Sequence, residues 1–258
     1  MIYQTLTVNE ADGIGLITLN RPTLMNALNA QMRAEITAAV RDLGQRMRVV
    51  VLTGEGRAFC SGQDLGDGAS INEIDLGRIL REEYEPMLQA IYDCPVPVIS
   101  AVNGPAAGAG ANLALAADVV IAKQSAYFLQ AFSRIGLIPD AGGTYWLPRL
   151  TGFARAMGQA LFAEPVSADD AAAQGLIWAS IPDERFDAEW RARAAQLANG
   201  PTLAYGAIKR ALRKSLTNDL EAQLDLEARL QGEVGKTRDF REGVMAFLEK
   251  RKARFEGR

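Results

Sequence analysis

A run of small residues at positions 104–111 constrains the fold more than any other stretch of this sequence. It follows an apolar segment that ends at Val102 and leads into the apolar residues 113–117, an order that predicts a strand, a loop and the start of a helix. Because Gly and Ala carry little or no side chain, such a loop lets another backbone or a ligand approach closely. The free N–H groups of a helix N-terminus also favour an anion, such as an enolate oxygen. The stretch by itself leaves tight packing and anion binding both open.

A second loop of small residues, 54–65, follows the run 49–53. That run is rich in β-branched residues, which predicts a strand buried on both faces of a sheet. In the loop, Gly62 can adopt a backbone conformation that other residues resist, and this would aim the N–H of Gln63. Taken alone, the loop also fits an ordinary turn.

The recurrence of strand, small-residue loop and helix predicts an α/β fold. A third loop, 136–144, carries Asp140 between a proline and a pair of glycines, where an aspartate also serves as an ordinary turn or cap residue. The repeated order predicts a layered, right-handed coil of ββα-like units, without the strict period of a regular repeat protein.

The remaining elements follow from hydrophobic spacing and capping residues. We expect a β-hairpin of residues 3–8 and 14–19, an amphipathic helix at 30–43 that Gly44 ends, and a strand at 119–122. A short helix between Ser167 and Gly175 and an extended segment at 176–178 should follow. Four later helices, forming either a subunit interface or a cap over the core, are expected near 186–198, 202–215, 218–231 and 238–250. Residues 66–84, with a capping box at 70–73, are expected to form a flap beside a site or a plain surface loop.

Composition and charge exclude several classes of function. With 258 residues and 48 % hydrophobic content the chain can bury a large core. No apolar run approaches the roughly 20 residues that a membrane span needs. The net charge of −3, with Lys and Arg scattered, gives no basic face for nucleic acid. Residues 1–5 lack a basic segment followed by an apolar one, so we expect a cytoplasmic protein with neither membrane nor nucleic acid as a partner.

The sequence contains no histidine, which excludes His-dependent catalytic triads and His-metal sites. Cys60 and Cys94 lack the spacing of metal ligands, and we expect both to be buried small hydrophobes and the chain to hold no metal. Any proton transfer must therefore use Asp, Glu, Lys, Tyr or Cys.

Taken together, residues 57–65, 101–110 and 136–144 resemble the crotonase (enoyl-CoA hydratase/isomerase) superfamily. Asn20-Arg21-Pro22 and Asn26-Ala27-Leu28 resemble its N-terminal segment, so the resemblance covers essentially the whole chain. It implies a crotonase-type spiral of ββα units with a C-terminal helical trimerisation region.

The same resemblance implies a division of labour along the chain. Residues 1–200 would be an acyl-CoA-binding catalytic core, and residues 201–258 a helical oligomerisation region. The implied substrate is an acyl-CoA thioester, with coenzyme A as part of the substrate and no separate cofactor. The implied assembly is a homotrimer or a dimer of trimers.

By the same resemblance, the backbone N–H groups of Gln63 and Ala109 form an oxyanion hole for the thioester carbonyl. Two preorganised amides stabilise the charge that develops on that oxygen, and losing one such donor typically costs about 10²–10³ in rate. The basic end 250–254 would either meet the phosphates of coenzyme A or be a solvated helix end. The residues implied along the coenzyme A path are Leu24, Ala58, Ser61, Gln63, Asp64 and Leu65.

The acid–base positions decide which reaction the resemblance implies. Hydratases of the superfamily carry two glutamates, and their positions are held here by Asn112 and Phe132, neither of which takes a proton at neutral pH. Asp140 remains as the candidate base. An apolar wall should raise its pKa. The candidates for that wall, each of which also fits an ordinary core position, are Phe132, Leu137, Tyr145 and Trp146.

Within the superfamily, the chain most resembles the isomerases of aerobic phenylacetate breakdown, on residues 59–65, 106–111, 131–140, 223–227 and 241–244. This implies that Asp140 shuttles a proton while an enolate is held. The reaction would convert ring-1,2-epoxyphenylacetyl-CoA to oxepin-CoA, and a 3-enoyl-CoA to a 2-enoyl-CoA. The alternatives are a general enoyl-CoA isomerase or hydratase of fatty-acid degradation, a catalytically inactive acyl-CoA-binding protein, and hydrolysis or halide displacement through a covalent carboxylate.

Overall fold

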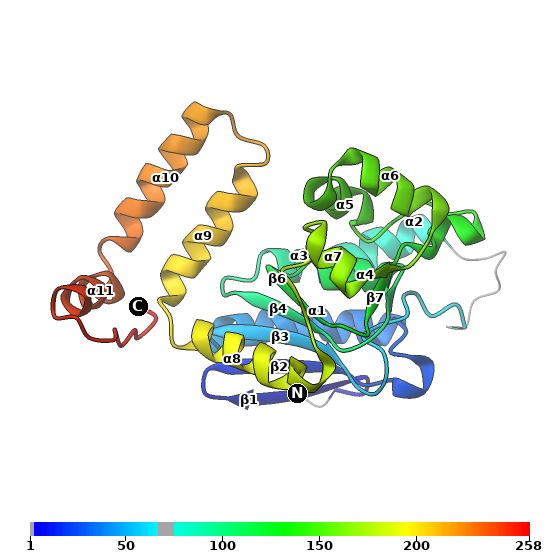
Figure 1. Ribbon diagram of the computed structural model, residues 1–258, viewed down its shortest axis with the longest axis horizontal. Helices are drawn as coiled ribbons and strands as arrows, with labels where there is room; N and C mark the ends of the chain where they lie inside the picture. Colours follow the sequence, from blue (N-terminus) through cyan, green and yellow to red (C-terminus); the bar gives the residue numbers. More distant parts are fainter. Residues whose placement is uncertain (1–2, 67–74) are drawn as a thin grey trace.

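The computed structural model describes residues 3–66 and 75–258, and a six-stranded sheet lies at its centre (Figure 1). The sheet order is β1-β2-β3-β4-β6-β9. β1 pairs with β2 in antiparallel fashion, and the other neighbouring pairs are parallel. The strands are β1 (Leu6–Ala11), β2 (Ile14–Leu19), β3 (Val49–Gly54), β4 (Val98–Val102), β6 (Val119–Lys123) and β9 (Ala179–Ile181).

A second, three-stranded sheet is built partly from the small-residue loop. Its order is β5-β7-β8, with β5 (Ala106–Ala107), β7 (Tyr127–Leu129) and β8 (Val166–Ser167). β5 pairs with β7 in parallel, and β7 pairs with β8 in antiparallel fashion. The loop after β4 is therefore held by a sheet on its way to the next helix.

Both faces of the large sheet are covered, as the β-branched run in β3 predicts. Val50 and Leu52 point into a core with α1 (Ala30–Arg46), α3 (Glu85–Tyr92) and α4 (Ala109–Leu115). Val49 and Val51 point to the opposite face, where α8 (Phe186–Ala198) contributes Phe186 and Trp190. Figure 1 shows the sheet between these layers.

The last three helices form an extension from this body. α9 (Thr202–Lys214) and α10 (Leu220–Val234) pack side by side and project away from the sheet, and α11 (Arg238–Leu248) follows (Figure 1). Lys209 of α9 is only 9 % exposed, and its Nζ lies 2.7 Å from Asp118 Oδ2. It also donates to the carbonyls of Cys94 and Val96, so one buried lysine joins the extension to the body.

Shorter elements complete the fold. They are α2 (Leu76–Ile79), a π-helical turn (Leu80–Tyr84), α5 (Gly143–Thr151), α6 (Phe153–Phe162), α7 (Ala168–Ala173) and 3₁₀ turns at Pro22–Leu24, Ala131–Ile135 and Asp183–Arg185. The predicted capping box at 70–73 lies outside the described residues, as do residues 67–74 of the predicted flap. The last part of that flap is helical, in α2 and the π-helical turn.

Three predicted boundaries were wrong. α1 runs through Gly44 to Arg46, because Gly44 serves close packing: a Cβ there would lie 2.9 Å from Cys94 Sγ. The first strand is Leu6–Ala11 rather than 3–8, because Ala11 pairs with Ile14 across a two-residue turn. The segment 176–178 does not begin a strand, since the N–H groups of its first two residues donate to a carbonyl at the end of α7.

Candidate active site

The small-residue loops pack against one another backbone to backbone. Cys60 pairs with Ala106 in a parallel bridge, its N–H donating to the Pro105 carbonyl and its own carbonyl accepting from Ala107. A Cβ on Gly110 would collide with the Cys60 carbonyl. Tight packing, one of the two interpretations of this sequence, is therefore present here.

The bridge between Leu28 and Gln63 orients the Gln63 amide. The Leu28 N–H donates to the Gly62 carbonyl at 2.8 Å, and the Asp64 N–H donates to the Leu28 carbonyl at 3.1 Å. Because residues on either side of Gln63 bond to Leu28, the N–H of Gln63 itself points away from it. Gly62 has φ +99°, and a Cβ there would lie 2.8 Å from the Ala107 carbonyl oxygen and 3.4 Å from the Ala109 nitrogen. Glycine at 62 thus lets the Gln63 segment reach the start of α4.

The Ala109 amide is the other predicted donor, and it is the first residue of α4. Gly108 before it has φ 51° and ψ −128°, and its own N–H donates to the Leu129 carbonyl at 2.7 Å. Within residues 3–66 and 75–258, neither Gln63 N–H nor Ala109 N–H donates to an acceptor. Two adjacent segments therefore each carry a backbone N–H without an acceptor in the described part of the chain.

Asp140 is tied to the same helix through its main chain. Asn112, the fourth residue of α4 and fully buried, donates from Nδ2 to the Asp140 carbonyl at 2.7 Å. Its Oδ1 accepts from Gln130 Nε2 at 2.9 Å. The Gly143 N–H also donates to the Asp140 carbonyl, at 2.8 Å. The position of a family glutamate thus holds a side chain that positions the predicted base.

The Asp140 side chain is half-buried, and one of its two carboxyl oxygens lacks a hydrogen-bond partner within the part of the chain that the structure describes. Its Oδ1 is buried and makes no hydrogen bond among the described residues. Burial disfavours the charged form and raises the pKa of Asp140 to about 6. A carboxylate with that pKa accepts a proton much better than an exposed aspartate does, while still being ionised at neutral pH.

Aromatic side chains pack against glycines of two of the loops. The ring of Phe132 faces the amide loop, with its Cζ 3.8 Å from the place of a Cβ on Gly108. Trp146 packs on Gly142, two residues after Asp140, and Tyr145 meets Trp146 edge-on with ring centroids 4.7 Å apart. Leu137 joins Phe132 through a backbone hydrogen bond of 3.0 Å. That these four side chains form an apolar wall around the Asp140 carboxyl stays a prediction.

The residues predicted along the coenzyme A path lie near one another but differ in exposure. Ser61 Oγ donates to the Leu24 carbonyl at 3.3 Å, and Leu24 and Leu65 are 50 % and 66 % exposed. Asp64 forms a 2.8 Å ion pair with Arg21. Only 1 % of Ala58 is exposed, so its side chain belongs to the interior.

The basic C-terminal end is already engaged within the chain. Arg251 lies 2.6 Å from carboxylate oxygens of both Glu242 and Glu249. This pairing fits the interpretation of the end as a solvated helix terminus.

Both cysteines are buried, as predicted, and burial raises the pKa of Cys60 to about 12. Cys60 is therefore a thiol at neutral pH and no nucleophile. No group of carboxylates and thiols in the described part of the chain is arranged to hold a metal ion. None of the helices described is both long and apolar enough to cross a membrane.

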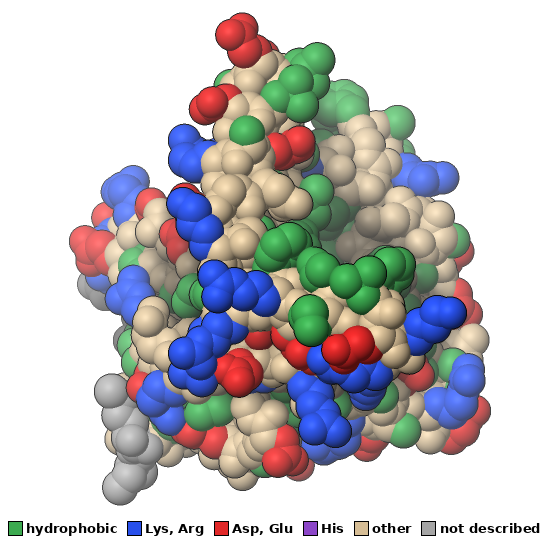
Figure 2. All heavy atoms as spheres, turned by 90° about the vertical axis from the view of Figure 1, so that its left-hand side faces the viewer, with side chains coloured by type: hydrophobic (Ala, Val, Ile, Leu, Met, Phe, Trp, Pro, Cys, Tyr) green, Lys and Arg blue, Asp and Glu red, His purple; other side chains and the backbone are tan. Residues whose placement is uncertain are grey.

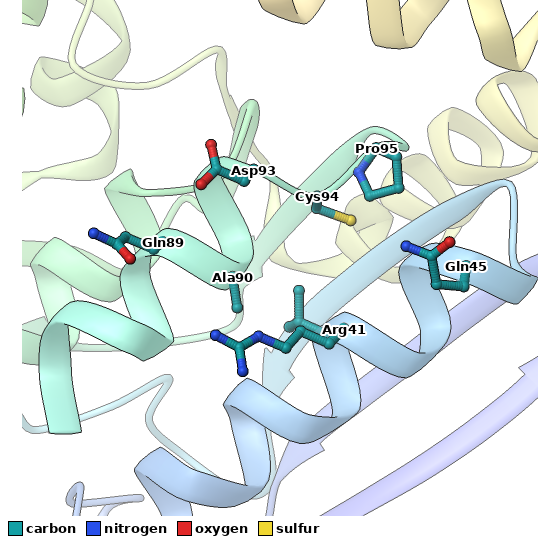
Figure 3. Close-up of a pocket in the computed structure, with 8 residues that line it drawn as sticks. Arg41, Gln45, Gln89, Ala90, Asp93, Cys94 and Pro95 are labelled. Atoms are coloured by element: carbon teal, nitrogen blue, oxygen red, sulfur yellow. The ribbon is translucent and has the colours of Figure 1, made fainter. Parts of the chain in front are cut away.

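A separate hollow of about 180 Å³ lies between α1 and α3 (Figure 3). Arg41 and Gln45 line it from α1, and Gln89 and Ala90 of α3 line it together with the turn at Asp93. None of the predicted site residues lines this hollow, so it is separate from the site around Asp140.

The sequence analysis missed three polar residues beside the site: Arg33, Glu83 and Tyr84. They are spread over α1 and the π-helical turn, and hydrogen bonds and ion pairs join them to one another and to the Gln63 side chain. The sequence offered one signal for these residues: Arg33 directly follows Met32, an apolar position of the predicted amphipathic helix.

Comparison with known families decides the relationship of this chain. The model of the enoyl-CoA hydratase/isomerase family matches residues 9–258. The chain belongs to this family. Membership of the enoyl-CoA hydratase/isomerase family supports an enzyme and confirms the crotonase fold that the motifs predict.

The names of curated relatives include both a hydratase and an isomerase. A Rhodobacter capsulatus protein named "Probable enoyl-CoA hydratase" is 64 % identical over 100 % of both chains. The Escherichia coli K12 protein named "1,2-epoxyphenylacetyl-CoA isomerase" is 45 % identical over 95 % of this chain and 96 % of its own. Family membership is thus plain, and the names leave the reaction to be argued from the site.

Solved structures of family members share the whole architecture. The enoyl-CoA hydratase from Bacillus anthracis has a TM-score of 0.91 at 31 % identity, covering 99 % of this chain and 100 % of its own. The enoyl-CoA hydratase from Polaromonas sp. JS666 has a TM-score of 0.91 at 30 % identity, covering 97 % and 99 %. The C-terminal helical extension is therefore part of the family fold.

Proposed function

We propose that this chain is an acyl-CoA isomerase in which Asp140 is the sole acid–base residue. The observation that carries the proposal is the half-buried carboxyl of Asp140, whose buried Oδ1 has no hydrogen-bond partner among the described residues and whose pKa is raised to about 6. The two positions where family hydratases hold glutamates carry Asn112 and Phe132. One acid is sufficient for moving a proton within a substrate, because the same carboxyl can take it and return it.

The proposed reaction is a proton transfer through an enolate. The Asp140 carboxylate accepts a proton from the carbon next to the thioester carbonyl, and the electron pair of that C–H bond forms the enolate. The N–H groups of Gln63 and Ala109 donate to the enolate oxygen, and Asp140 then returns its proton further along the conjugated system. Coenzyme A is carried by the substrate, and this scheme uses no separate cofactor.

The proposed substrate is ring-1,2-epoxyphenylacetyl-CoA, with oxepin-CoA as its product. The 45 % identity to the isomerase of Escherichia coli supports this choice. Straight-chain 3-enoyl-CoA should be converted to 2-enoyl-CoA as well, since the same proton is acidified by the same thioester. The aromatic side chains near Asp140 suit a cyclic acyl group as well as a linear one.

A hydratase is the second candidate, because the 64 % identical relative is named as one. The geometry favours it less. Asn112 uses its amide nitrogen to hold the Asp140 carbonyl, and Phe132 offers no proton acceptor. Hydratases of the family add water with two acids, and here that reaction would have to proceed with Asp140 alone.

Product analysis separates these candidates. The purified protein is incubated with enzymatically generated ring-1,2-epoxyphenylacetyl-CoA and, in parallel, with a straight-chain 3-enoyl-CoA and a 2-enoyl-CoA. Faster formation of oxepin-CoA supports the proposal, and hydration of the 2-enoyl ester as the main reaction contradicts it. Binding of these esters without turnover would mean an acyl-CoA-binding protein, and a covalent adduct seen by mass spectrometry would mean the carboxylate-ester route.

We also propose that the chain assembles as a homotrimer or a dimer of trimers through its helical extension. Figure 2 shows hydrophobic side chains gathered around a hollow on the face of this extension. A groove of about 450 Å³ between α9, α10 and α11 is lined by apolar residues. Such a surface is characteristic of an interface, and its large exposed members include Leu203, Phe240, Val244, Phe247 and Leu248.

A further inference from the structure

A buried polar cluster lies directly behind the Gln63 amide. Gln63 Oε1 accepts two hydrogen bonds, one from the Tyr84 hydroxyl at 2.5 Å and one from Arg33 Nη1 at 2.9 Å. Its Nε2 donates to the Asp64 carbonyl at 3.3 Å. The Gln63 side chain is thus held at both polar atoms, although it stands on a loop.

The same arginine also holds the strand segment that flanks Gln63. Arg33 Nη1 donates to the Leu28 carbonyl at 2.7 Å, the carbonyl that also accepts from the Asp64 N–H. Its Nη2 and Nε lie 2.6 and 3.1 Å from Glu83 Oε2. One guanidinium, 2 % exposed, therefore joins α1, the Leu28 segment, Gln63 and the π-helical turn.

Tyr84 ends that π-helical turn and is 3 % exposed. Its ring lies under the Arg33 guanidinium, 4.8 Å from centroid to Cζ. π-helical turns break the regular hydrogen bonding of a helix and occur often at functional sites. Here the turn brings a hydroxyl and a carboxylate to the cluster from consecutive residues.

Burying these groups is costly, and the packing of α1 does not require it. An arginine and a tyrosine hydroxyl lose hydration on burial unless every polar atom finds a partner. Apolar side chains would fill the same space at no such cost. The cluster contacts the side chain of Gln63. The backbone N–H of the same residue points away from Leu28 and carries the proposed function.

A flip of one peptide would destroy that arrangement. Gly62, at φ +99°, is a backbone position that tolerates rotation, and a rotation of the Gly62–Gln63 peptide would turn the Gln63 N–H out of the site. The Leu28 N–H fixes the carbonyl of this peptide from one side. The hydrogen bonds of Arg33 and Tyr84 fix the residue from its side-chain end.

We propose that Tyr84 and Arg33 are positioning residues that hold the Gln63 N–H in the direction of the substrate carbonyl. This inference rests on the proposed function, in which that N–H is an oxyanion donor. Asp140 lies near enough for its charge to raise the pKa of Tyr84, together with the larger effect of burial. Tyr84 therefore stays neutral and acts as a hydrogen-bond donor to Gln63 rather than as an acid.

The first test replaces Tyr84 by phenylalanine, which keeps the ring and removes the hydroxyl. Tyr84→Phe should lower kcat for 3-enoyl-CoA about 5- to 10-fold, the size of one orienting hydrogen bond, and leave the Kd for acyl-CoA unchanged. Tyr127→Phe, on β7 of the smaller sheet, is the matched control and should behave as the wild type. An unchanged kcat in Tyr84→Phe would overturn the proposal.

A double-mutant cycle separates positioning from general destabilisation. Gln63→Leu keeps the backbone N–H and removes the acceptor of both hydrogen bonds, so it should lower kcat by at least as much as Tyr84→Phe. Adding Tyr84→Phe to Gln63→Leu should then cost nothing more. Losses that simply multiply would contradict the proposal. Should Gln63→Leu not fold, Gln63→Asn, whose amide is too short to reach both donors, replaces it in the cycle.

A spectroscopic readout makes the inference independent of turnover. Phenylacetyl-CoA with ¹³C at the thioester carbonyl is bound to the wild type and to Tyr84→Phe, and the carbonyl stretch is recorded by infrared difference spectroscopy. Two aligned donors lower the stretching frequency in the wild type, and the lowering should be smaller in Tyr84→Phe. An identical shift in both proteins would overturn the inference, whereas a wild type that polarises the carbonyl without isomerising any ester would contradict the proposed function alone.

Discussion

Asp140 combines a carboxyl of raised pKa with a fixed main chain. One oxygen of its half-buried carboxyl is buried without a hydrogen-bond partner among the described residues, whereas its carbonyl is held by Asn112 and by the Gly143 N–H. The pKa of the group is therefore raised without loss of position. This combination is what a single residue needs if it is to take and return a proton within one enolate lifetime.

The raised pKa predicts the pH dependence of the reaction. Since the base form of Asp140 takes the proton, kcat/KM for isomerisation should rise as the pH increases through about 6 and level off above it. A pH–rate profile measured on 3-enoyl-CoA between pH 5 and 8 checks this. A profile that is flat across pH 6 would remove Asp140 as the base.

The same shift predicts a stability effect. A folded-state pKa above that of the unfolded chain stabilises the protein at low pH, and this contribution is lost as the pH rises through about 6. Asp140→Asn should therefore be more stable than the wild type at pH 7.5, on the order of 1–2 kcal/mol after solvent screening. The gain should shrink at pH 5. Melting temperatures at both values test it, and a less stable variant at pH 7.5 would contradict it.

What the sequence could predict at this scale depended on the motifs. The proposed chemistry of Asp140, which stays a prediction, and the loss of two acids followed from residue types at known motif positions. The contact of Asn112 with the Asp140 carbonyl did not, because its partner stands 28 residues further along the chain. Arg33 and Tyr84 were missed for the same reason: their roles arise from contacts between α1, a π-helical turn and a loop.

At the scale of elements, glycines decide how closely the loops approach. Gly62 and Gly110 each leave no room for a side chain against the neighbouring loop, and Gly44 does the same for α1 against the turn at Cys94. Hydrophobic spacing and caps predicted most helices well, as for α8 at 186–198. The end of α1 was misjudged because a helix-ending glycine and a close-packing glycine look alike in sequence.

Gly62→Ala tests this packing. The new Cβ would lie 2.8 Å from the Ala107 carbonyl oxygen at a backbone angle that favours glycine, so the loop must shift. We expect a loss of about 1–3 kcal/mol in unfolding free energy and at least a 10-fold drop in kcat. Gly232→Ala on α10, with no atom within 4 Å of its new Cβ, is the control and should keep both. Full activity in Gly62→Ala, measured beside a denaturant titration, would contradict the account.

At the scale of the whole molecule, the fold separates a rigid core from an apolar extension. α9 is joined to the body by the buried Lys209 and by a 2.6 Å ion pair between Arg213 and Asp118. The sequence predicted these helices but left open whether they cap their own core or meet other subunits. Helical spacing reports which face is apolar, and it says nothing of which surface covers that face.

The proposed trimer predicts the effect of a charge on α11. Phe247 is 82 % exposed, and Phe247→Glu should convert the assembly to monomers because a desolvated carboxylate in the interface costs several kcal/mol. Light scattering coupled to size-exclusion chromatography measures the mass. Phe153→Glu on α6, with Phe153 73 % exposed, is the matched control. A wild type that is already monomeric would contradict the proposed assembly.

The most direct test of the central claim is α-proton exchange in Asp140→Asn. Phenylacetyl-CoA is incubated in D₂O with the wild type and with the variant, and deuterium at the carbon next to the carbonyl is followed by mass spectrometry, with binding measured by calorimetry. The account predicts exchange by the wild type, a loss of about 10²–10⁴-fold in Asp140→Asn, and unchanged binding of the ester. Exchange by the variant at the wild-type rate would show that another group takes the proton and would contradict the account.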